Sequence, residues 1–348
     1  MRVLTRRKML LHTSGILLGL PFIARVAENQ PDPKAACAFA VARLRRGYLV
    51  IPSHAEDCRA ASDSPTIFQA ASLSKPVVAT LALKLVLRGK LDLNRPLSEL
   101  LPDGYVHRQN LFALREPPIL DVVPSEMLKK VTARGLLSHT SGLPNWSSTG
   151  PLRFTFEPGA QWQYSGEGYV LLQHLLQTLT GVPLNELAAV ELFRPLGLRD
   201  CAFKLTERIS QSLVPGRSAS GKINQLRFPF EIAANSLYTS AADYAKFMSS
   251  VLEDERLLSL VSHAPVPVPK APNVYWGLGW GIERTSERSH IWHWGNNPGF
   301  RALAMADLST KDAVVALAAT ETGMPRAKSS LREALPGPHP GLDLYLVQ

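Results

Sequence analysis

The segment 76–88 constrains the fold more than any other part of the sequence, because apolar residues occupy nearly every side of the helix that it would form. These residues are Val77, Val78, Leu81, Leu83, Leu85, Val86 and Leu87. A helix without a polar face must be covered on all sides, so the sequence predicts a helix inside a core, ended by Gly89. The 348 residues of the chain are enough for one large domain or for two lobes that share a cleft.

Patterns typical of strands stand near both ends of the chain. Residues 36–43 and 48–51, joined by a turn at Gly47, predict a hairpin. Further along, short apolar runs separated by Gly, Pro, Asn and Asp predict several strands. These runs are 277–282, 290–293, 301–307 and 313–319.

The middle of the chain predicts two more helices. Leucines form one stripe over residues 168–180, which are followed by Gly181, and residues 243–252 give a further helical pattern. The order of strands, helices and strands predicts an α+β fold, in which both chain ends build one sheet and helices pack on it. The segment 336–348, rich in Pro and Gly, is expected to be a surface tail.

The net charge of +9 is concentrated near the N-terminus. Residues 1–50 contain nine Lys or Arg and two acidic residues, whereas residues 51–348 contain 29 basic and 27 acidic residues. The body of the protein therefore carries no basic excess of the kind that nucleic-acid binding requires, and we expect no nucleic-acid partner.

The N-terminus has the layout of an export signal. A basic head over residues 1–8, with adjacent arginines Arg6 and Arg7, precedes an apolar stretch over residues 9–23 that is too short to span a bilayer comfortably. The arginine pair resembles a twin-arginine signal. We expect residues 1–27 to be an export signal or an N-terminal anchor rather than a basic cytosolic arm, which predicts a periplasmic or otherwise exported protein.

The cleavage site and the cysteines leave alternatives open. Arg25 interrupts the small-residue pattern before Ala27, so the leader could be cut or could stay as a membrane anchor. Three cysteines allow at most one internal disulfide in an oxidising compartment, and Cys37 with Cys58 is the pair that we expect. The third cysteine is Cys201, and no thiol is expected to act as a nucleophile.

Ser72 and Lys75 carry the clearest chemical signal in the sequence. Their spacing of three residues puts both side chains on one face of a helix, at the point where the buried helix begins. A serine hydroxyl becomes a nucleophile when a nearby base takes its proton, and a partly desolvated lysine can be that base. Pro76 cannot donate a backbone hydrogen bond and is expected to loosen the first helical turn.

Four further sequence blocks, which follow Ser72 and Lys75 along the chain, support a functional role for this pair. They are Leu136-Leu137-Ser138-His139-Thr140-Ser141-Gly142-Leu143-Pro144, Tyr164-Ser165-Gly166, Gly277-Leu278-Gly279-Trp280, and His293-Trp294-Gly295 with Pro298-Gly299-Phe300. With Ser72 and Lys75, the chain resembles the serine β-lactamase and penicillin-binding superfamily, in its branch of class C β-lactamases, DD-peptidases and esterases. The resemblance covers residues 36–322. It implies a domain over residues 36–335, with an antiparallel sheet from both chain ends, helices packed on it and an all-helical lobe.

The resemblance also implies roles for individual residues. Ser72 would form an acyl-enzyme, Lys75 would assist its deprotonation, and Tyr164 would be the shared general base and later the proton donor. A phenol near cationic groups can ionise below its ordinary pKa of about 10, so Tyr164 and Lys75 are expected to share one proton. The backbone N–H of Asn296, next to Gly295, would join that of Ser72 in an oxyanion hole.

Two departures from the family pattern bear on the substrate. Gly166 stands where an asparagine usually binds the substrate amide, and His293 replaces a lysine that binds a substrate carboxylate. A histidine is mostly neutral at pH 7. Both changes weaken the case for β-lactams. Trp294 is expected to be a wall of the site, while His139 is expected to stabilise its loop rather than to act in catalysis.

The sequence therefore predicts an exported serine hydrolase acting on small esters or short peptide amides. One alternative is a β-lactamase or a D-alanyl-D-alanine carboxypeptidase. Another is a penicillin-binding or sensing module that keeps the fold and turns over slowly. We find no metal-ligand spacing and no glycine-rich phosphate loop, so no metal or cofactor is expected, and the partner is a small ester, peptide or β-lactam.

Overall fold

A computed structural model describes residues 39–50, 66–112, 117–147, 149–224 and 226–348. The predicted leader over residues 1–27 and the cysteines Cys37 and Cys58 lie outside these residues. Cys201 is a free thiol.

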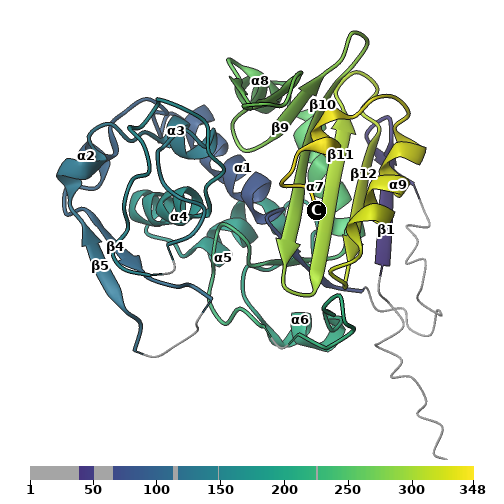
Figure 1. Cartoon of the computed structure of the whole chain (residues 1–348), viewed down its shortest axis with the longest axis horizontal. Coiled ribbons are helices and arrows are strands. Elements are labelled where there is room, and N and C mark those ends of the chain that lie inside the picture. Colours follow the sequence, from purple (N-terminus) through teal and green to yellow (C-terminus); the bar gives the residue numbers. More distant parts are fainter. Residues whose placement is uncertain (1–38, 51–65, 113–116, 148, 225) are drawn as a thin grey trace, which may run out of the picture. The chain divides into compact units, whose positions relative to one another are not determined.

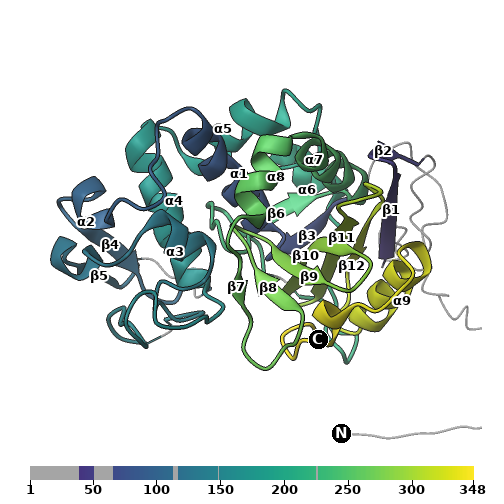
Figure 2. The same cartoon turned by 90° about the horizontal axis from the view of Figure 1, so that it is seen from above.

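The fold is built on one eight-stranded sheet, in which every neighbouring pair of strands is antiparallel. Its order is β2-β1-β12-β11-β10-β9-β8-β7. The strands are β1 (Phe39–Arg45), β2 (Tyr48–Leu49), β7 (Val266–Pro267), β8 (Val274–Trp276), β9 (Gly281–Arg284), β10 (Ser289–Asn297), β11 (Phe300–Asp307) and β12 (Ala313–Ala318). Figures 1 and 2 show β1 beside β12. The prediction that both chain ends form one sheet is confirmed.

Both faces of this sheet are buried, as the alternation along β12 shows. Val315 and Leu317 point into one apolar core, and Val314 and Ala316 point into a second one. The first face is covered by α7 (Ala241–Glu253) and the second by α9 (Met324–Ala334), with the sheet between them in Figure 2. A strand whose side chains are buried alternately on two faces must be apolar throughout, which explains the unbroken apolar run over β12.

The central helix α1 (Ser74–Leu87) is buried on nearly all sides, as the sequence predicts. It follows the short strand β3 (Phe68–Ala71), which pairs with β6 (Leu237–Thr239). The helix begins two residues before Pro76, so this proline is the third helical residue. The first four N–H groups of a helix have no partner within the helix, and Pro76 therefore removes no helical hydrogen bond.

Helices and one hairpin lie on the side of α1 that faces away from the sheet (Figures 1 and 2). The elements there are α2 (Leu97–Leu100), β4 (Tyr105–Arg108), β5 (Leu120–Val123), a 3₁₀ turn (Ser125–Leu128), α3 (Ala133–Leu137) and α4 (Gly166–Thr180). The expected all-helical lobe thus contains a two-stranded sheet, β4 with β5. Because β4 and β5 are short and pair only with each other, their alternation of apolar and polar residues is too weak to predict a strand from the sequence.

The remaining helices connect these parts. They are α5 (Leu184–Ala188) with a π-helical turn (Ala189–Phe193), α6 (Glu207–Ser212) and α8 (Glu255–Ser262). The predicted helix over 168–180 is α4, capped by the Ser165 side chain and ended by Gly181 at a φ of 70°. No helix among the described residues is long and apolar enough to cross a membrane.

One predicted strand is largely wrong. Of residues 277–282, only Gly281 and Ile282 belong to a strand, because the residues before them form the turn between β8 and β9. Gly279 adopts a φ of 92°, and a Cβ there would lie 2.1 Å from the Cβ of Ala79 in α1. This turn is therefore pressed against the central helix, which requires glycine.

The segment 336–348 is not a surface tail. It contains a 3₁₀ turn (Pro340–Asp343), and Leu342 and Val347 are buried in the second core. The Pro and Gly residues of this segment correctly indicate an irregular backbone. The apolar side chains between them nevertheless pack into the core and hold the segment against the fold.

Candidate active site

Ser72 and Lys75 meet where β3 turns into α1. Ala71 adopts a positive φ of 49°, which bends the chain between the strand and the helix. The Nζ of Lys75 donates to the Ser72 Oγ at 3.2 Å and to the carbonyl of Ala234 at 2.8 Å. The predicted pair is thus within hydrogen-bond distance.

The amine of Lys75 is fully buried, and it forms no salt bridge with any carboxylate in the described part of the chain. Burial disfavours its charged form and holds the pKa of Lys75 well below its ordinary value. A neutral amine has a lone pair that can take the proton of the neighbouring hydroxyl. The geometry therefore suits Lys75 to act as the base for Ser72.

Tyr164 lies two residues before α4, next to the capping residue Ser165, and its ring centroid is 4.8 Å from the Nζ of Lys75. Burial raises the pKa of Tyr164 above its ordinary value, and the Ser72 hydroxyl lowers this pKa by a smaller amount. The hydroxyl is buried and forms no hydrogen bond of ordinary geometry with the described residues. The expectation of a lowered phenol pKa is wrong, because the burial of the hydroxyl outweighs the interactions that would stabilise the phenolate.

His293 is fully buried on β10 and does not line the cleft that contains Ser72. Its Nδ1–H donates to the carbonyl of Trp294 at 2.7 Å. Burial, and to a lesser extent Lys75, lower the pKa of His293 to about 3. The imidazole is therefore neutral, as expected. Its neighbours Trp294 and Asn296 line the cleft, and contact between His293 and substrate stays a prediction.

The cleft at Ser72 has a volume of about 420 Å³. Aromatic rings and side-chain amides form most of its wall, and none of the described residues that line it is charged. The lining residues are Ser72, Phe112, Asn145, Trp146, Tyr164, Asn235, Trp294, Asn296, Asn297, Pro298 and Leu346. Trp294 lies 4.8 Å from Tyr164 between ring centroids, so it is a wall of the site as predicted.

Gly166 is covered by two residues that follow the Ser138–Gly142 loop. The backbone N–H of Gly166 donates to the Asn145 Oδ1 at 3.0 Å, and a Cβ on Gly166 would lie 2.8 Å from the Trp146 ring. Gly166 does not line the cleft, while Asn145 and Trp146 do. An asparagine side chain is therefore present near the position where the family pattern expects one, but it comes from another loop.

Gly295 brings β10 against β3, because a Cβ there would lie 2.4 Å from the carbonyl oxygen of Ala70. This close approach sets Asn296 beside the start of α1. The N–H groups of Ser72 and Asn296, expected as the oxyanion hole, thus belong to segments that pack directly on each other.

His139 supports the site from behind. It is fully buried, its Nδ1 accepts from the backbone N–H of Ser165 at 3.1 Å, and its ring lies 4.5 Å from that of Tyr164. The interpretation as a structural residue agrees with this geometry. Its partner is the residue after Tyr164, however, rather than the neighbouring hydroxyl groups of its own loop.

Sequence reasoning missed six residues of the cleft: Asn145, Trp146, Phe112, Asn235, Asn297 and Leu346. The first two directly follow a recognised block, so adjacency could have indicated them. Asn235 presents a buried Oδ1 without a hydrogen-bond partner in the described residues, and Leu346 comes from the expected tail. Nothing in the sequence around either residue signals a site.

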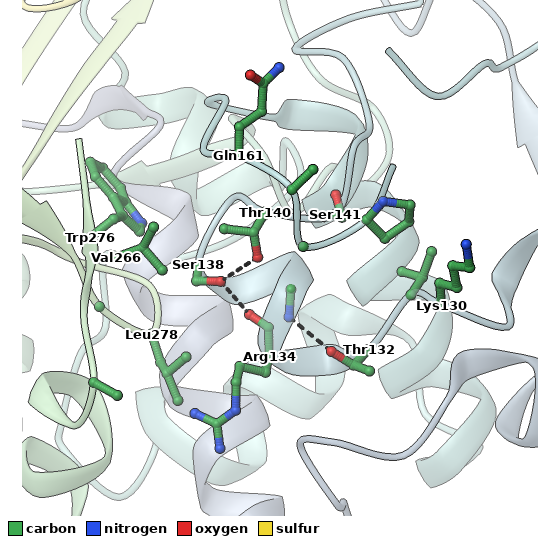
Figure 3. Close-up of a pocket in the computed structure, with 17 residues that line it drawn as sticks. Lys130, Thr132, Arg134, Ser138, Thr140, Ser141, Gln161, Val266, Trp276 and Leu278 are labelled. Atoms are coloured by element: carbon green, nitrogen blue, oxygen red, sulfur yellow. Dashed lines mark hydrogen bonds between the residues drawn. The ribbon is translucent and has the colours of Figure 1, made fainter. Parts of the chain in front are cut away.

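A second hollow of about 350 Å³ is lined in part by Ser138, Thr140 and Ser141 (Figure 3). The hydroxyl groups of Ser138 and Thr140 bond each other at 3.0 Å, and that of Thr132 accepts from Gly135 at 3.1 Å. Ser72, Lys75 and Tyr164 do not line this hollow. The hydroxyl groups of Thr132, Ser138 and Thr140 are therefore used within the fold.

Comparisons with known proteins agree with this geometry. Esterase EstB of Burkholderia gladioli is 28% identical over 276 residues, which are 71% of this chain and 62% of the esterase. AmpH of Escherichia coli K12, a D-alanyl-D-alanine-carboxypeptidase/endopeptidase, is 24% identical over 211 residues, which are 55% of this chain and 50% of AmpH. The chain thus spans between half and two thirds of the length of these curated relatives.

Solved structures share the fold. A β-lactamase/D-alanine carboxypeptidase from Pseudomonas syringae superposes with a TM-score of 0.68 at 17% identity, over 87% of this chain and 95% of that one. The D-amino acid amidase of Ochrobactrum anthropi gives a TM-score of 0.65 at 22% identity, over 87% and 94%. The fold is therefore that of the β-lactamase/transpeptidase group. The Beta-lactamase family profile matches residues 7–336, and the chain belongs to this family.

Proposed function

We propose that the protein is a serine hydrolase that forms an acyl-enzyme on Ser72 and acts on small uncharged esters or short amides. The observation that carries this proposal is the cleft itself, which contains Ser72 and Tyr164, borders the buried Lys75 and has no charged side chain among its described lining residues. The names of two relatives, an esterase and a D-amino acid amidase, support the same substrate classes.

The first half of the proposed reaction acylates the enzyme. Lys75 takes the proton of the Ser72 hydroxyl, and the Oγ attacks the carbonyl carbon of the substrate. The backbone N–H groups of Ser72 and Asn296 stabilise the negative oxygen of the tetrahedral intermediate. As this intermediate collapses, the bond to the leaving group breaks. The Tyr164 hydroxyl gives the leaving group a proton, and the proton held by Lys75 restores the phenol.

The second half releases the acid. A water molecule gives a proton to the same basic groups and attacks the acyl carbon. The bond to the Ser72 Oγ then breaks, and the oxygen regains its proton. A protonated Tyr164 suits this sequence, because burial keeps a proton on its hydroxyl for delivery.

The electrostatics argue against substrates that need a bound carboxylate, such as a β-lactam or a D-alanyl-D-alanine peptide. His293 is neutral and buried, and the charged form of Lys75 is disfavoured by burial. Buried carboxylates require a charged partner. Asn145 and Asn235 line the cleft instead, and side-chain amides pair well with neutral carbonyl and N–H groups.

The test compares three substrates on the purified protein: p-nitrophenyl butyrate, a D-alanyl-D-alanine peptide and a chromogenic cephalosporin. We expect steady turnover of the ester that is lost in Ser72→Ala. Turnover of the peptide or the cephalosporin above that of the ester would favour a carboxypeptidase or a β-lactamase. A penicillin adduct that forms and persists, without ester turnover, would favour the slow penicillin-binding or sensing module.

We also propose that the protein is exported, on the basis of the basic head, the arginine pair and the apolar stretch over residues 1–27. Whether the leader is cut or anchors the chain is part of the same test. Cell fractionation of the full chain and of an Arg6→Lys, Arg7→Lys variant should show loss of the exported form in the variant. A wholly cytosolic wild-type protein would refute export.

A further inference from the structure

We infer that the C-terminal segment 339–347 is a built wall of the cleft, and that Leu346 limits the size of the substrate group accepted beside Ser72. This inference rests on the proposed function, whose substrates it narrows. Leu346 lines the same cavity as Ser72 and Tyr164, although it lies far from both in the sequence. Its neighbours Leu344 and Val347 are buried, whereas Tyr345 between them is 69% exposed.

The segment is held in place by buried hydrogen bonds to Glu283 on β9, which we call the anchor. The His339 Nδ1 lies 2.6 Å from the Glu283 Oε1 on β9, and the N–H of Gly341 donates to the other carboxylate oxygen at 3.0 Å. The His339 Nε2 donates to the carbonyl of Leu335 at 2.6 Å. In addition, the Nζ of Lys328 donates to the carbonyl of Leu342 at 2.6 Å.

Glu283 and His339, with His290, also form a group whose ligand atoms lie within 4.8 Å of one another. A hydrogen-bonded anchor explains this group better than a metal site does. The contact of 2.6 Å between the His339 Nδ1 and Glu283 has hydrogen-bond length, and the Nε2 of the same ring is bonded to a carbonyl. Burial opposes the charge of His339, but the hydrogen bonds to Glu283 and to the Leu335 carbonyl raise its pKa overall, which favours an imidazolium paired with the carboxylate.

Close packing connects this anchor to the catalytic groups. A Cβ on Gly341 would lie 2.5 Å from the Trp292 ring, so the segment rests directly on that ring. Trp292 stacks on Trp294 with centroids 5.7 Å apart, and Trp294 packs on Tyr164. Since these rings are rigid and buried, Leu346 is held at a fixed place relative to Tyr164 and sets a firm limit on the space beside it.

The experiment uses the full chain and two series of esters. One series lengthens the acyl group from p-nitrophenyl acetate to the octanoate, and the other enlarges the leaving group from p-nitrophenyl acetate to naphthyl acetate. For each series we take the ratio of kcat/KM for the largest ester to kcat/KM for p-nitrophenyl acetate. In Leu346→Ala we expect this ratio to rise about tenfold in one of the two series, because a few extra methylenes in an apolar pocket contribute an effect of this size. In Leu346→Trp the same ratio should fall.

Tyr345→Ala is the matched control, because this side chain is adjacent but exposed, and it should leave both ratios unchanged. Unchanged ratios in both Leu346 variants, with melting temperatures like that of the wild type, would overturn the inference. The proposed function fails separately, if wild-type turnover of p-nitrophenyl acetate does not depend on Ser72. In that case, the rates at which small and bulky alkyl fluorophosphonates label the protein would give the same comparison of sizes.

Discussion

The Nζ of Lys75 lies 3.2 Å from the Oγ of Ser72, inside a part of the fold where the amine is completely removed from solvent. In the described residues it is held by the carbonyl of Ala234 rather than by a carboxylate. A carbonyl holds the amine in place without stabilising its positive charge as strongly as a carboxylate would. This combination favours the neutral amine, whose lone pair can take the proton of the Ser72 hydroxyl.

Replacing Lys75 should therefore slow turnover strongly without unfolding the protein. We expect Lys75→Met to lose about 10²–10⁴-fold in kcat/KM for p-nitrophenyl butyrate, the usual contribution of a general base. Lys75→Arg should lose as much, because a guanidinium cannot give up its proton. Lys84→Met, on the same helix and outside the cleft, is the control. Retained activity in Lys75→Arg would exclude the proposed base.

The same burial predicts how stability depends on pH. The pKa of Lys75 is lower in the folded state than in the unfolded state, so the unfolded chain binds more protons and stability rises with pH up to the ordinary lysine pKa of about 10.4. Lys75→Met should lack this rise. Denaturant unfolding at pH 7 and pH 9.5 measures it, and parallel curves for wild type and variant would contradict the lowered pKa.

Tyr164→Phe separates proton delivery from packing. The ring stays against Trp294, and the lost hydroxyl has no hydrogen-bond partner in the described residues, so the free energy of unfolding should change by less than about 1 kcal/mol. Turnover of an ethyl ester, whose leaving group needs a proton, should fall by about 10²–10⁴-fold. Turnover of a p-nitrophenyl ester should fall much less. An equal loss for both esters would argue against Tyr164 as the proton donor.

The fold was largely predictable from the sequence because its main signals are local. The unbroken apolar pattern of α1 and the runs of β10, β11 and β12 depend on burial that the residues themselves require. The turn at Gly279 differs from the predicted strand because this glycine allows contact with Ala79 in a distant helix, which leaves no local pattern. The β4–β5 hairpin and the buried segment after Pro336 depend likewise on partners far away in the sequence.

The candidate site divides in the same way. Ser72, Lys75 and Tyr164 stand in recognisable blocks, and the fold brings them together. Their pKa shifts cannot be predicted from the spacing of these residues in the sequence. The desolvation of Lys75 and of Tyr164 depends on which parts of the fold cover them. Asn145, Asn235 and Leu346 reach the cleft from three separate segments, and their positions follow only from the tertiary structure.

His293 should make the protein sensitive to acid. Its pKa is about 3 in the folded state, against about 6.5 in an unfolded chain, so lowering the pH adds a proton to the unfolded state first and destabilises the fold. For these two values, the loss between pH 7.5 and pH 5 is about 2 kcal/mol. In His293→Gln, the difference in unfolding free energy from the wild type should shift by that amount in favour of the variant. A constant difference would show that His293 does not titrate in this way.

The last prediction concerns Gly166, where the family pattern usually has an asparagine. Restoring it should not create a β-lactamase, because a Cβ at this position would lie 2.6 Å from the carbonyl oxygen of Asn145 and 2.8 Å from the Trp146 ring. We expect Gly166→Asn to lower the free energy of unfolding by about 1–3 kcal/mol through overpacking, and to leave cephalosporin hydrolysis at the level of Ser72→Ala. Gly166→Ala, which adds only the Cβ, is the matched control and should show most of the same loss. A stable Gly166→Asn protein that hydrolyses the cephalosporin would mean that Asn145 and Trp146 give way easily, and that the missing amide alone keeps this cleft from β-lactams.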